Sequence, residues 1–227
     1  MTEAAQLVLD LGHRAASGRE DFLVAPSNAE AVRWLDLWPA WPAPALTLHG
    51  PAGCGKSHLA QVWRQRSEAL LLARESLVVD GLGERLGARR AAIVEDAERG
   101  VEEEALLHLY NLLAEARGHL LLTSRAPPAR WRISLADLRS RLLAAPAVAV
   151  EAPDDALLSA LLVKLFADRQ LRVSAELVAF LVPRMERSFA GAARLVAALD
   201  AAALAAGRPP TLPLARSVLA AATRDET

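Results

Sequence analysis

The sequence predicts an α/β fold, a parallel sheet with helices on both faces, followed by an all-helical C-terminal domain. Short apolar runs alternate with helical patterns as far as about residue 152. Such alternation is typical of parallel strands joined by crossover helices. After Pro153 the strands stop and four helical patterns follow in succession. The sequence therefore predicts an α/β base with a helical appendage.

The first part of the chain is expected to contain strands at 45–50, 91–96, 119–124 and 147–153. The first helix follows an apolar entry at residues 21–26, with Ser27 or Asn28 as its N-cap. The proline-rich segment 39–44 separates this helix from the first strand. Two more helices are expected between the strands, at 57–69 and 102–118.

The helical patterns of the second part lie at 154–170, 174–186, 187–207 and 212–225. Residues 12–20 are small and polar, which predicts a flexible tether. Three segments are therefore expected: an N-terminal arm at 1–20, an α/β base at 21–152 and a helical lid at 153–227.

Composition sets bounds on the class of protein. The chain is 53% hydrophobic but only 4% aromatic, which favours tightly packed helices over a β-sandwich. Its 26 basic and 27 acidic residues nearly cancel, so the charge predicts no broad attraction to nucleic acid. The single Cys54 excludes an intrachain disulfide framework and a cysteine zinc site, which fits a reducing compartment.

The N-terminus does not resemble a signal peptide, because Glu3 precedes an apolar patch that is too short for one. No apolar run approaches the roughly 18 residues of a membrane span. The sequence therefore predicts a cytoplasmic protein without membrane contact.

The stretch GPAGCGKS fits the phosphate-loop pattern G-x-x-x-x-G-K-[ST], directly after a predicted strand and at the start of a helix. Small residues let backbone N–H groups surround phosphates, and the helix N-terminus adds partial positive charge. Lys56 would reach the β- and γ-phosphates, and the Ser57 hydroxyl is placed for Mg²⁺. A chance glycine-rich turn is the alternative, but one of only two lysines in the chain stands here. The expected nucleotide-binding residues are Gly50, Pro51, Ala52, Gly53, Cys54, Gly55, Lys56, Ser57 and His58.

An acidic pair, Glu95 and Asp96, ends the second predicted strand. The pair could be ordinary surface charge at a strand end. Beside a phosphate loop, the two carboxylates are better interpreted as the residues that hold Mg²⁺ with Ser57 and position water. The predicted cofactors are therefore ADP or ATP with Mg²⁺.

Several stretches in combination resemble the AAA+ ATPase module of the bacterial replication initiator DnaA: GKSHL, the acidic pair, LLLTSRAPP, LADLRSRL and, upstream, FLVAPSN. The resemblance runs from about Phe22 to the C-terminus. It implies an AAA+ base with a helical lid. It also implies that Thr123 and Ser124 lie at the first sensor of the γ-phosphate. That family usually has Asp where this chain has Glu95, so the protein's own ATP hydrolysis is expected to be weak or absent.

The same resemblance assigns roles to two arginines. Arg141 falls where the family carries an arginine finger, which would act in trans on the ATP of a neighbouring subunit. Considered by itself, Arg141 would be one more solvated arginine on a helix. Arg187 matches the second sensor in the lid, with Arg184 and Arg194 as competing candidates.

The hexamer QLVLDL near the N-terminus allows two readings, an edge strand or helix turn packed on the body, or a peptide for another protein. No residues after Thr227 supply the DNA-binding domain that DnaA carries, so a full initiator is not expected. A DnaA-like module with such a hexamer resembles the Hda regulators, which inactivate DnaA and carry a clamp-binding Q-L-x-L-x-L peptide. The peptide residues implied by this resemblance are Gln6, Leu7, Leu9 and Leu11.

The Hda resemblance implies a function and its partners. The protein would bind the sliding clamp, the β subunit of DNA polymerase III, and promote hydrolysis of DnaA-bound ATP. It would contact DNA mainly indirectly and work at the replisome or nucleoid. A helicase loader of the DnaC type is the strongest alternative, followed by a small-molecule kinase and a structural adaptor. The residues leave both a monomer and a homodimer open.

Overall fold

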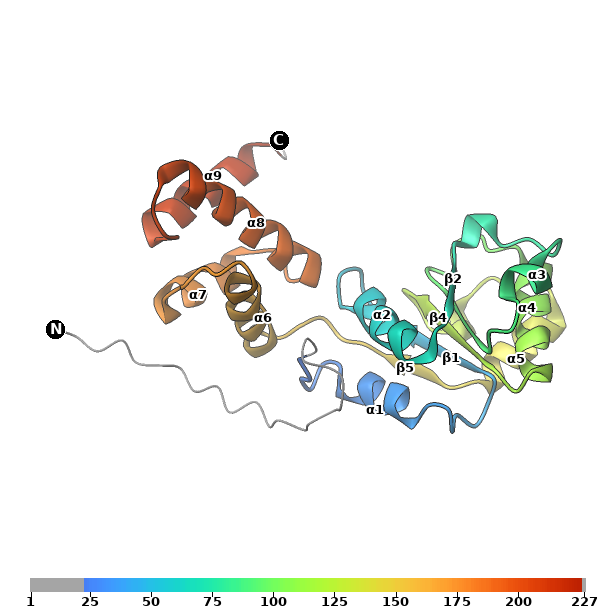
Figure 1. Cartoon of the computed structure of the whole chain (residues 1–227). Coiled ribbons are helices and arrows are strands. Elements are labelled where there is room, and N and C mark those ends of the chain that lie inside the picture. Colours follow the sequence, from blue (N-terminus) through green and yellow to red (C-terminus); the bar gives the residue numbers. More distant parts are fainter. Residues whose placement is uncertain (1–22, 226–227) are drawn as a thin grey trace. The chain divides into compact units, whose positions relative to one another are not determined.

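The computed structural model describes residues 23–225, with side chains described as far as residue 221. The described chain divides into two compact units, a base of residues 26–151 and a helical unit of residues 23–25 and 152–225 (Figure 1). The sequence had placed residues 23–25 in the base. Leu23 instead packs against the apolar core of the helical unit.

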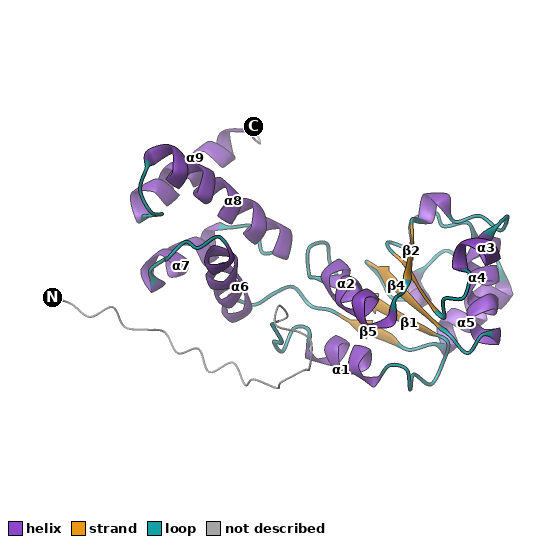
Figure 2. Ribbon diagram, in the orientation of Figure 1, coloured by secondary structure: helices purple, strands orange, loops and turns teal. Residues whose placement is uncertain are grey.

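The base is built on a five-stranded sheet with the order β2-β3-β4-β1-β5 (Figure 2). All four strand pairs are parallel. This arrangement confirms the predicted α/β fold with a parallel sheet. The strands are β1 (Ala45–His49), β2 (Leu70–Leu72), β3 (Ala91–Val94), β4 (His119–Ser124) and β5 (Ala147–Ala149).

The register of the sheet brings the functional segments to one edge. His49, the last residue of β1, pairs with Ser124, the last residue of β4. Val94, the last residue of β3, pairs with Leu122. Because all strands run the same way, the segments that leave β1, β3 and β4 emerge at the carboxyl edge, where ligands bind in open α/β sheets.

Helices cover both faces of this sheet (Figure 1). One face carries α1 (Ala29–Leu37) and α2 (Lys56–Ser67), and α2 contacts β3 and β4. The opposite face carries α3 (Leu82–Leu86), α4 (Glu103–Glu115) and α5 (Ala136–Ala144). Two short 3₁₀ helices, η1 (Arg74–Ser76) and η2 (Pro128–Arg130), complete the base. Its main apolar cluster joins the sheet to α3, α4 and α5.

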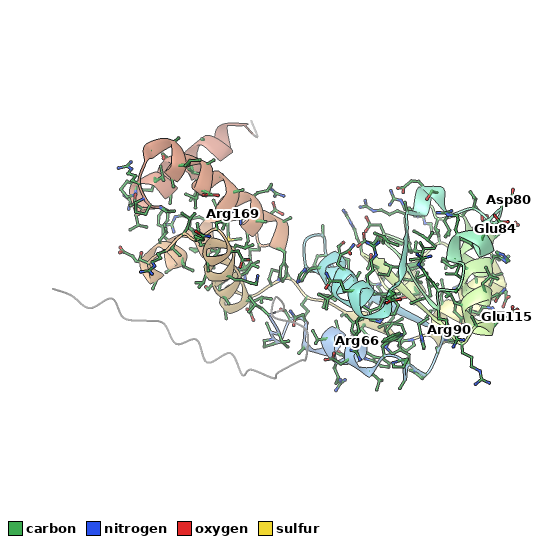
Figure 3. The ribbon with its side chains drawn as sticks, in the orientation of Figure 1. Arg66, Asp80, Glu84, Arg90, Glu115 and Arg169 are labelled. Carbon is green, nitrogen blue, oxygen red and sulfur yellow. The ribbon has the colours of Figure 1, made fainter. Side chains whose placement is uncertain are left out.

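An aromatic cluster closes the amino edge of the sheet, opposite the phosphate loop. The Trp41 ring stacks on Trp63 with centroids 5.3 Å apart, and Trp38 meets Trp63 edge-on at 5.9 Å. His119, the first residue of β4, lies 5.3 Å from Trp41. Burial lowers the pKa of His119, so the imidazole is neutral at neutral pH. The Arg66 guanidinium, labelled in Figure 3, lies 5.6 Å from the Trp38 ring and ties α2 to the segment after α1.

The helical unit consists of α6 (Asp155–Asp168), α7 (Ala175–Leu181), η3 (Val182–Arg184), α8 (Phe189–Ala206) and α9 (Leu212–Asp225). Three of these helices begin with a side-chain cap on a backbone N–H group. Asp154 caps α6, Ser174 caps α7 and Ser188 caps α8. Such caps satisfy N–H groups that have no partner within the helix. Arg169, labelled in Figure 3, lies 3.6 Å from Asp200 and joins the end of α6 to α8.

Helix α8 has the length and apolar composition that could cross a membrane, and it is the one such helix in the part of the chain that the structure describes. One side of this helix forms the core of the helical unit, where Leu195, Val196 and Leu199 are buried. Core packing accounts for that part of its apolar composition.

Besides the two 3₁₀ helices, one strand and two α-helices of the base were absent from the sequence expectation: β2, α3 and α5. Each is short, from three to nine residues, so its own periodicity is weak evidence. The strand expected at 91–96 ends at Val94. Asp96 adopts a positive φ of 49°, and its N–H group donates to the Thr123 hydroxyl at 3.1 Å instead of continuing the strand.

We expect Trp63→Ala to lower the free energy of unfolding of the base by about 3–5 kcal/mol, because it opens a cavity beneath two other indoles. All five tryptophans of the chain lie in the base, so tryptophan fluorescence during urea unfolding measures this unit alone. Val78→Ala is the control, since the Val78 side chain is about half exposed, and should change stability by less than about 0.5 kcal/mol. Equal stability of the two variants would contradict the prediction.

Candidate functional site

The phosphate loop begins at Gly50, a position with no room for a side chain. A Cβ at Gly50 would lie 2.0 Å from the Val150 carbonyl oxygen. The Gly50 N–H group donates to the Ser124 carbonyl at 3.2 Å, and the Val150 N–H group donates to His49 at 2.7 Å. The start of the loop is therefore fixed by the ends of β4 and β5 on either side of it.

Two further glycines shape the loop. Gly53 and Gly55 have positive φ values of 74° and 102°, which side chains disfavour. Gly55 is also the N-cap residue of α2 and offers no side-chain oxygen to the helix. The first-turn N–H groups of α2 therefore receive no side-chain cap, and such groups are typical anion ligands.

The Lys56 side chain folds back onto the loop. Its Nζ donates to the carbonyl oxygens of Gly50 and Pro51, each at 2.8 Å, and lies 3.6 Å from the Cys54 sulfur. Lys56 is only 8% exposed, and no carboxylate pairs with it among residues 23–225. A nearly buried ammonium held by neutral carbonyls keeps its charge available for an anion.

His49 adds to the electrostatic character of this edge. Burial lowers the pKa of the His49 imidazole, and the charges of Lys56 and Arg130 lower it further. His49 is therefore neutral at neutral pH, while the charges that act on it are positive. A positive local field of this kind favours phosphate.

The acidic pair lies beside a cavity at the ends of β2 and β3. Glu95 and Asp96 line this cavity, whose volume is about 360 Å³, together with Leu71–Glu75. The Glu95 Oε1 atom is buried and has no hydrogen-bond partner among the described residues. An unpaired buried carboxylate oxygen is costly, and it is the kind of atom that a metal ion or a bound water satisfies.

The donor set fits magnesium. Mg²⁺ prefers oxygen ligands and is commonly held by one or two carboxylates together with substrate phosphates. The Ser57 hydroxyl, which is exposed at the start of α2, and the carboxylates of Glu95 and Asp96 are ligands of this kind. Among the described residues no group of three or more His, Cys, Asp or Glu side chains is placed to hold a metal ion, so phosphate oxygens and water would complete the coordination.

The side chains of Thr123 and Ser124 are engaged within the base. The Thr123 hydroxyl accepts the Asp96 N–H group, and the Ser124 hydroxyl donates to the Ala126 carbonyl at 2.8 Å. Both residues are almost fully buried. Thr123 therefore supports the turn that carries Asp96, a role that the sequence did not indicate.

Arg141 lies on α5, which covers the sheet face opposite α2 (Figure 1). Its Nε and Nη2 donate to the two carboxylate oxygens of Asp137 at 2.9 and 3.1 Å. Its guanidinium carbon lies 5.4 Å from the centre of the Tyr110 ring. The hydrogen bond to Asp137 raises the pKa of Arg141, so the group stays charged. The structure thus does not bring Arg141 to its own phosphate loop.

The three candidate lid arginines have different partners within the helical unit. Arg187 pairs with the Asp155 carboxylate and donates to the Pro153 carbonyl at 3.1 Å. Arg194 pairs with Glu186, and Arg184 lies over Phe180. Arg184 and Arg194 also line a cavity of about 840 Å³ formed mainly by η3, α8 and α9.

Some predicted residues lie outside the described chain, and others were missed. Gln6, Leu7, Leu9 and Leu11 fall within residues 1–22, which the structure does not describe. Asp137 and Tyr110, the partners of Arg141, were not singled out from the sequence. The four-residue spacing of Asp137 and Arg141 was the available signal, since side chains at i and i+4 meet on a helix.

Solved structures with a similar fold include replication initiation proteins and a Holliday junction branch migration motor. Domain III of the Thermotoga maritima replication initiation protein DnaA matches with a TM-score of 0.74 at 20% identity, over 87% of this chain and 93% of that one. AMPPCP-bound DnaA from Aquifex aeolicus matches with a TM-score of 0.65 at 13% identity, over 78% of this chain and 62% of that one. The Thermotoga maritima RuvB branch migration motor gives a TM-score of 0.62 at 14% identity, over 78% and 61%.

These likenesses confirm the AAA+ fold that the sequence resemblance implied. No curated protein sequence matches the chain. One family model does match: residues 154–219, which span α6 to most of α9, fit the lid domain of Hda. The chain thus combines a base that has the fold of DnaA domain III with a helical unit that is similar to the lid domain of Hda.

Proposed function

We propose that the chain is a regulatory inactivator of the replication initiator DnaA. In this proposal it binds an adenine nucleotide, attaches to the DNA-loaded sliding clamp, and places Arg141 in the ATP site of a DnaA molecule. Hydrolysis there leaves an inactive, ADP-bound initiator and limits re-initiation. The observation that carries the proposal is the Hda lid match on a base with the fold of DnaA.

The phosphate loop is the proposed nucleotide site. Lys56 and the N–H groups that open α2 would hold the phosphates, while Ser57, Glu95 and Asp96 would hold Mg²⁺. We assign ADP as the working nucleotide, and Ser124 and Arg187 as the residues that sense it. Arg187 is preferred over Arg184 and Arg194 because of its two partners at the start of the helical unit. It donates a hydrogen bond to the Pro153 carbonyl and forms an ion pair with Asp155. An AMPPCP-bound DnaA structure with the same fold supports adenine nucleotide binding.

The proposed role of Arg141 is to act on the nucleotide of the partner. A finger stabilises the negative charge that develops on the transferring phosphoryl group, an effect worth roughly 10³–10⁵ in rate. Arg141 sits on the sheet face opposite α2, which supports action in trans rather than on its own site. Glu95 stands at the first acidic position, and we propose that the protein's own hydrolysis is weak or absent.

The N-terminal hexamer is the proposed clamp ligand. The proposed partner is a preformed groove on the sliding clamp, the β subunit of DNA polymerase III. Gln6 would offer this groove an amide donor and acceptor, and Leu7, Leu9 and Leu11 would offer it apolar side chains. The net charge of −1 gives no reason for strong direct DNA binding. The clamp would therefore bring the protein to DNA, at the replisome within the cytoplasm. The proposal applies equally to a monomer and to a homodimer.

Lys56→Ala should weaken ADP binding about 10- to 100-fold, because hydrogen bonds to a charged donor contribute about 1.5–3 kcal/mol. Isothermal titration calorimetry with ADP and Mg²⁺ measures the loss. Lys164→Ala is a matched control, since Lys164 is the other lysine of the chain and pairs with Asp168 on α6. Unchanged ADP affinity in Lys56→Ala would refute the assigned site.

Arg141→Ala should reduce stimulated ATP hydrolysis by purified DnaA about 10³-fold or more, while ADP binding by the variant stays unchanged. The assay measures phosphate release from DnaA-bound ATP with the clamp loaded on DNA. Arg139→Ala, an exposed arginine on the same helix, should retain stimulation. If Arg141→Ala stimulates ATP hydrolysis by DnaA as fully as the parent does, Arg141 is not an arginine finger. Helicase loading would then be the next activity to test.

Gln6→Ala and Leu9→Ala should each abolish measurable binding to immobilised clamp, because a short extended peptide depends on a few side chains in pockets. Surface plasmon resonance with the full chain gives the affinity. Val8→Ala is the control, since position 8 is variable in the Q-L-x-L-x-L pattern. If all three variants bind the clamp as the parent does, the hexamer is not the clamp ligand.

A further inference from the structure

Arg141 is held from two sides by neighbouring helices. Asp137, one turn earlier on α5, accepts two hydrogen bonds from Nε and Nη2 in a side-by-side pair. Tyr110, a buried residue of α4, lies with its ring 5.4 Å from the guanidinium carbon. The carboxylate fixes the plane and direction of the guanidinium, and the ring supports it from another helix.

The pair leaves part of the guanidinium outside it. Arginine carries five N–H donors in a rigid planar fork. Asp137 engages the edge formed by Nε and Nη2, which leaves the two N–H groups of Nη1 outside the pair. The side chain of Arg141 is 37% exposed. A guanidinium that is already held along one edge and open along the other can bind a phosphate at little further cost in side-chain entropy.

The support beneath Asp137 and Arg141 is also fixed. The Glu103 carboxylate, in the first turn of α4, accepts the N–H groups of Ser134 and Leu135 at 2.7–3.1 Å, just before α5 begins. The hydrogen bond from Ser134 lowers the pKa of Glu103, so the carboxylate stays charged at neutral pH. Leu138 is buried in the apolar cluster shared with α4. The start of α5 is therefore tied to the helix that carries Tyr110.

An ordinary helix-stabilising pair is the competing interpretation. Lys164 and Asp168 on α6 have the same four-residue spacing, with a distance of 2.8 Å. Exposed pairs of this kind contribute only a few tenths of a kcal/mol to stability. The pair at Arg141 differs because both carboxylate oxygens are used and an aromatic ring from a second helix lies against the same group.

We propose that Asp137 and Tyr110 are positioning residues for Arg141, and that they present its Nη1 edge to the phosphates of a partner's nucleotide. The inference rests on the proposed function, since it requires that Arg141 acts in trans. The negative charge of Asp137 cancels the positive charge of Arg141 at long range, so Asp137 cannot help by attracting the partner. Any contribution of Asp137 to the stimulated rate must come from the orientation that it gives Arg141. Its loss should then lower the maximal rate without raising the concentration needed for half-maximal stimulation.

The test measures ATP hydrolysis by DnaA as the concentration of the full-length protein is raised, with loaded clamp present. Asp137→Ala should lower the maximal stimulated rate about 10- to 100-fold, the loss typical of a misplaced catalytic group. Asp137→Glu should recover part of that loss, because a carboxylate remains within reach of Arg141. Asp168→Ala removes the matched pair on α6 and should keep the full rate. Urea unfolding followed by tryptophan fluorescence checks that each variant has a folded base.

The outcomes separate this inference from the proposed function. If Asp137→Ala stimulates as well as the parent while Arg141→Ala does not, positioning by Asp137 is refuted and the finger stands. A faster rate in Asp137→Ala would mean that the pair restrains the finger, which also overturns the inference. If Arg141→Ala itself retains stimulation, the proposed function fails and there is no finger to position.

Discussion

The nucleotide edge of this protein depends on the absence of a side chain at Gly50. The carbonyl of Val150 occupies the space that a Cβ would fill, at 2.0 Å. That close approach places the end of β5 against the start of the loop, while the Ser124 carbonyl holds the Gly50 N–H group from β4. The Gly50 carbonyl in turn holds the Lys56 ammonium. The close approach of the Gly50 and Val150 backbones therefore determines where the loop begins and where the Lys56 ammonium lies.

Two hydrogen-bonded turns at the same edge are built on different chemistry. The phosphate loop relies on glycines and on an ammonium bound to neutral carbonyls. The neighbouring turn relies on a side chain, since the Thr123 hydroxyl accepts the N–H group of Asp96 at a positive φ. This places a cationic loop after β1 and an acidic pair after β3, the two strands that flank β4 in the sheet. Phosphate and a divalent cation need that combination of charges.

The local helix signals and the strand pattern were sufficient to predict the fold. Buried apolar runs predicted β1, β3, β4 and β5, and capped amphipathic stretches predicted the helical unit, because these patterns are local. β2 and α3 escaped because they have three and five residues, too few for a period to show. Their existence depends on neighbours, since β2 pairs with β3 and α3 packs on α4.

The sequence by itself determined the phosphate-loop residues and the acidic pair, because their chemistry follows from residue types at fixed spacing beside a strand. Only the tertiary structure decided what surrounds them. It brought the Thr123 hydroxyl to the Asp96 N–H group and the Val150 carbonyl to Gly50. It also brought the Tyr110 ring to the Arg141 guanidinium. The residues in these three contacts are between 27 and 100 positions apart in the sequence. Such separations carry no local pattern, and the contacts exist only once the sheet and its helices have packed.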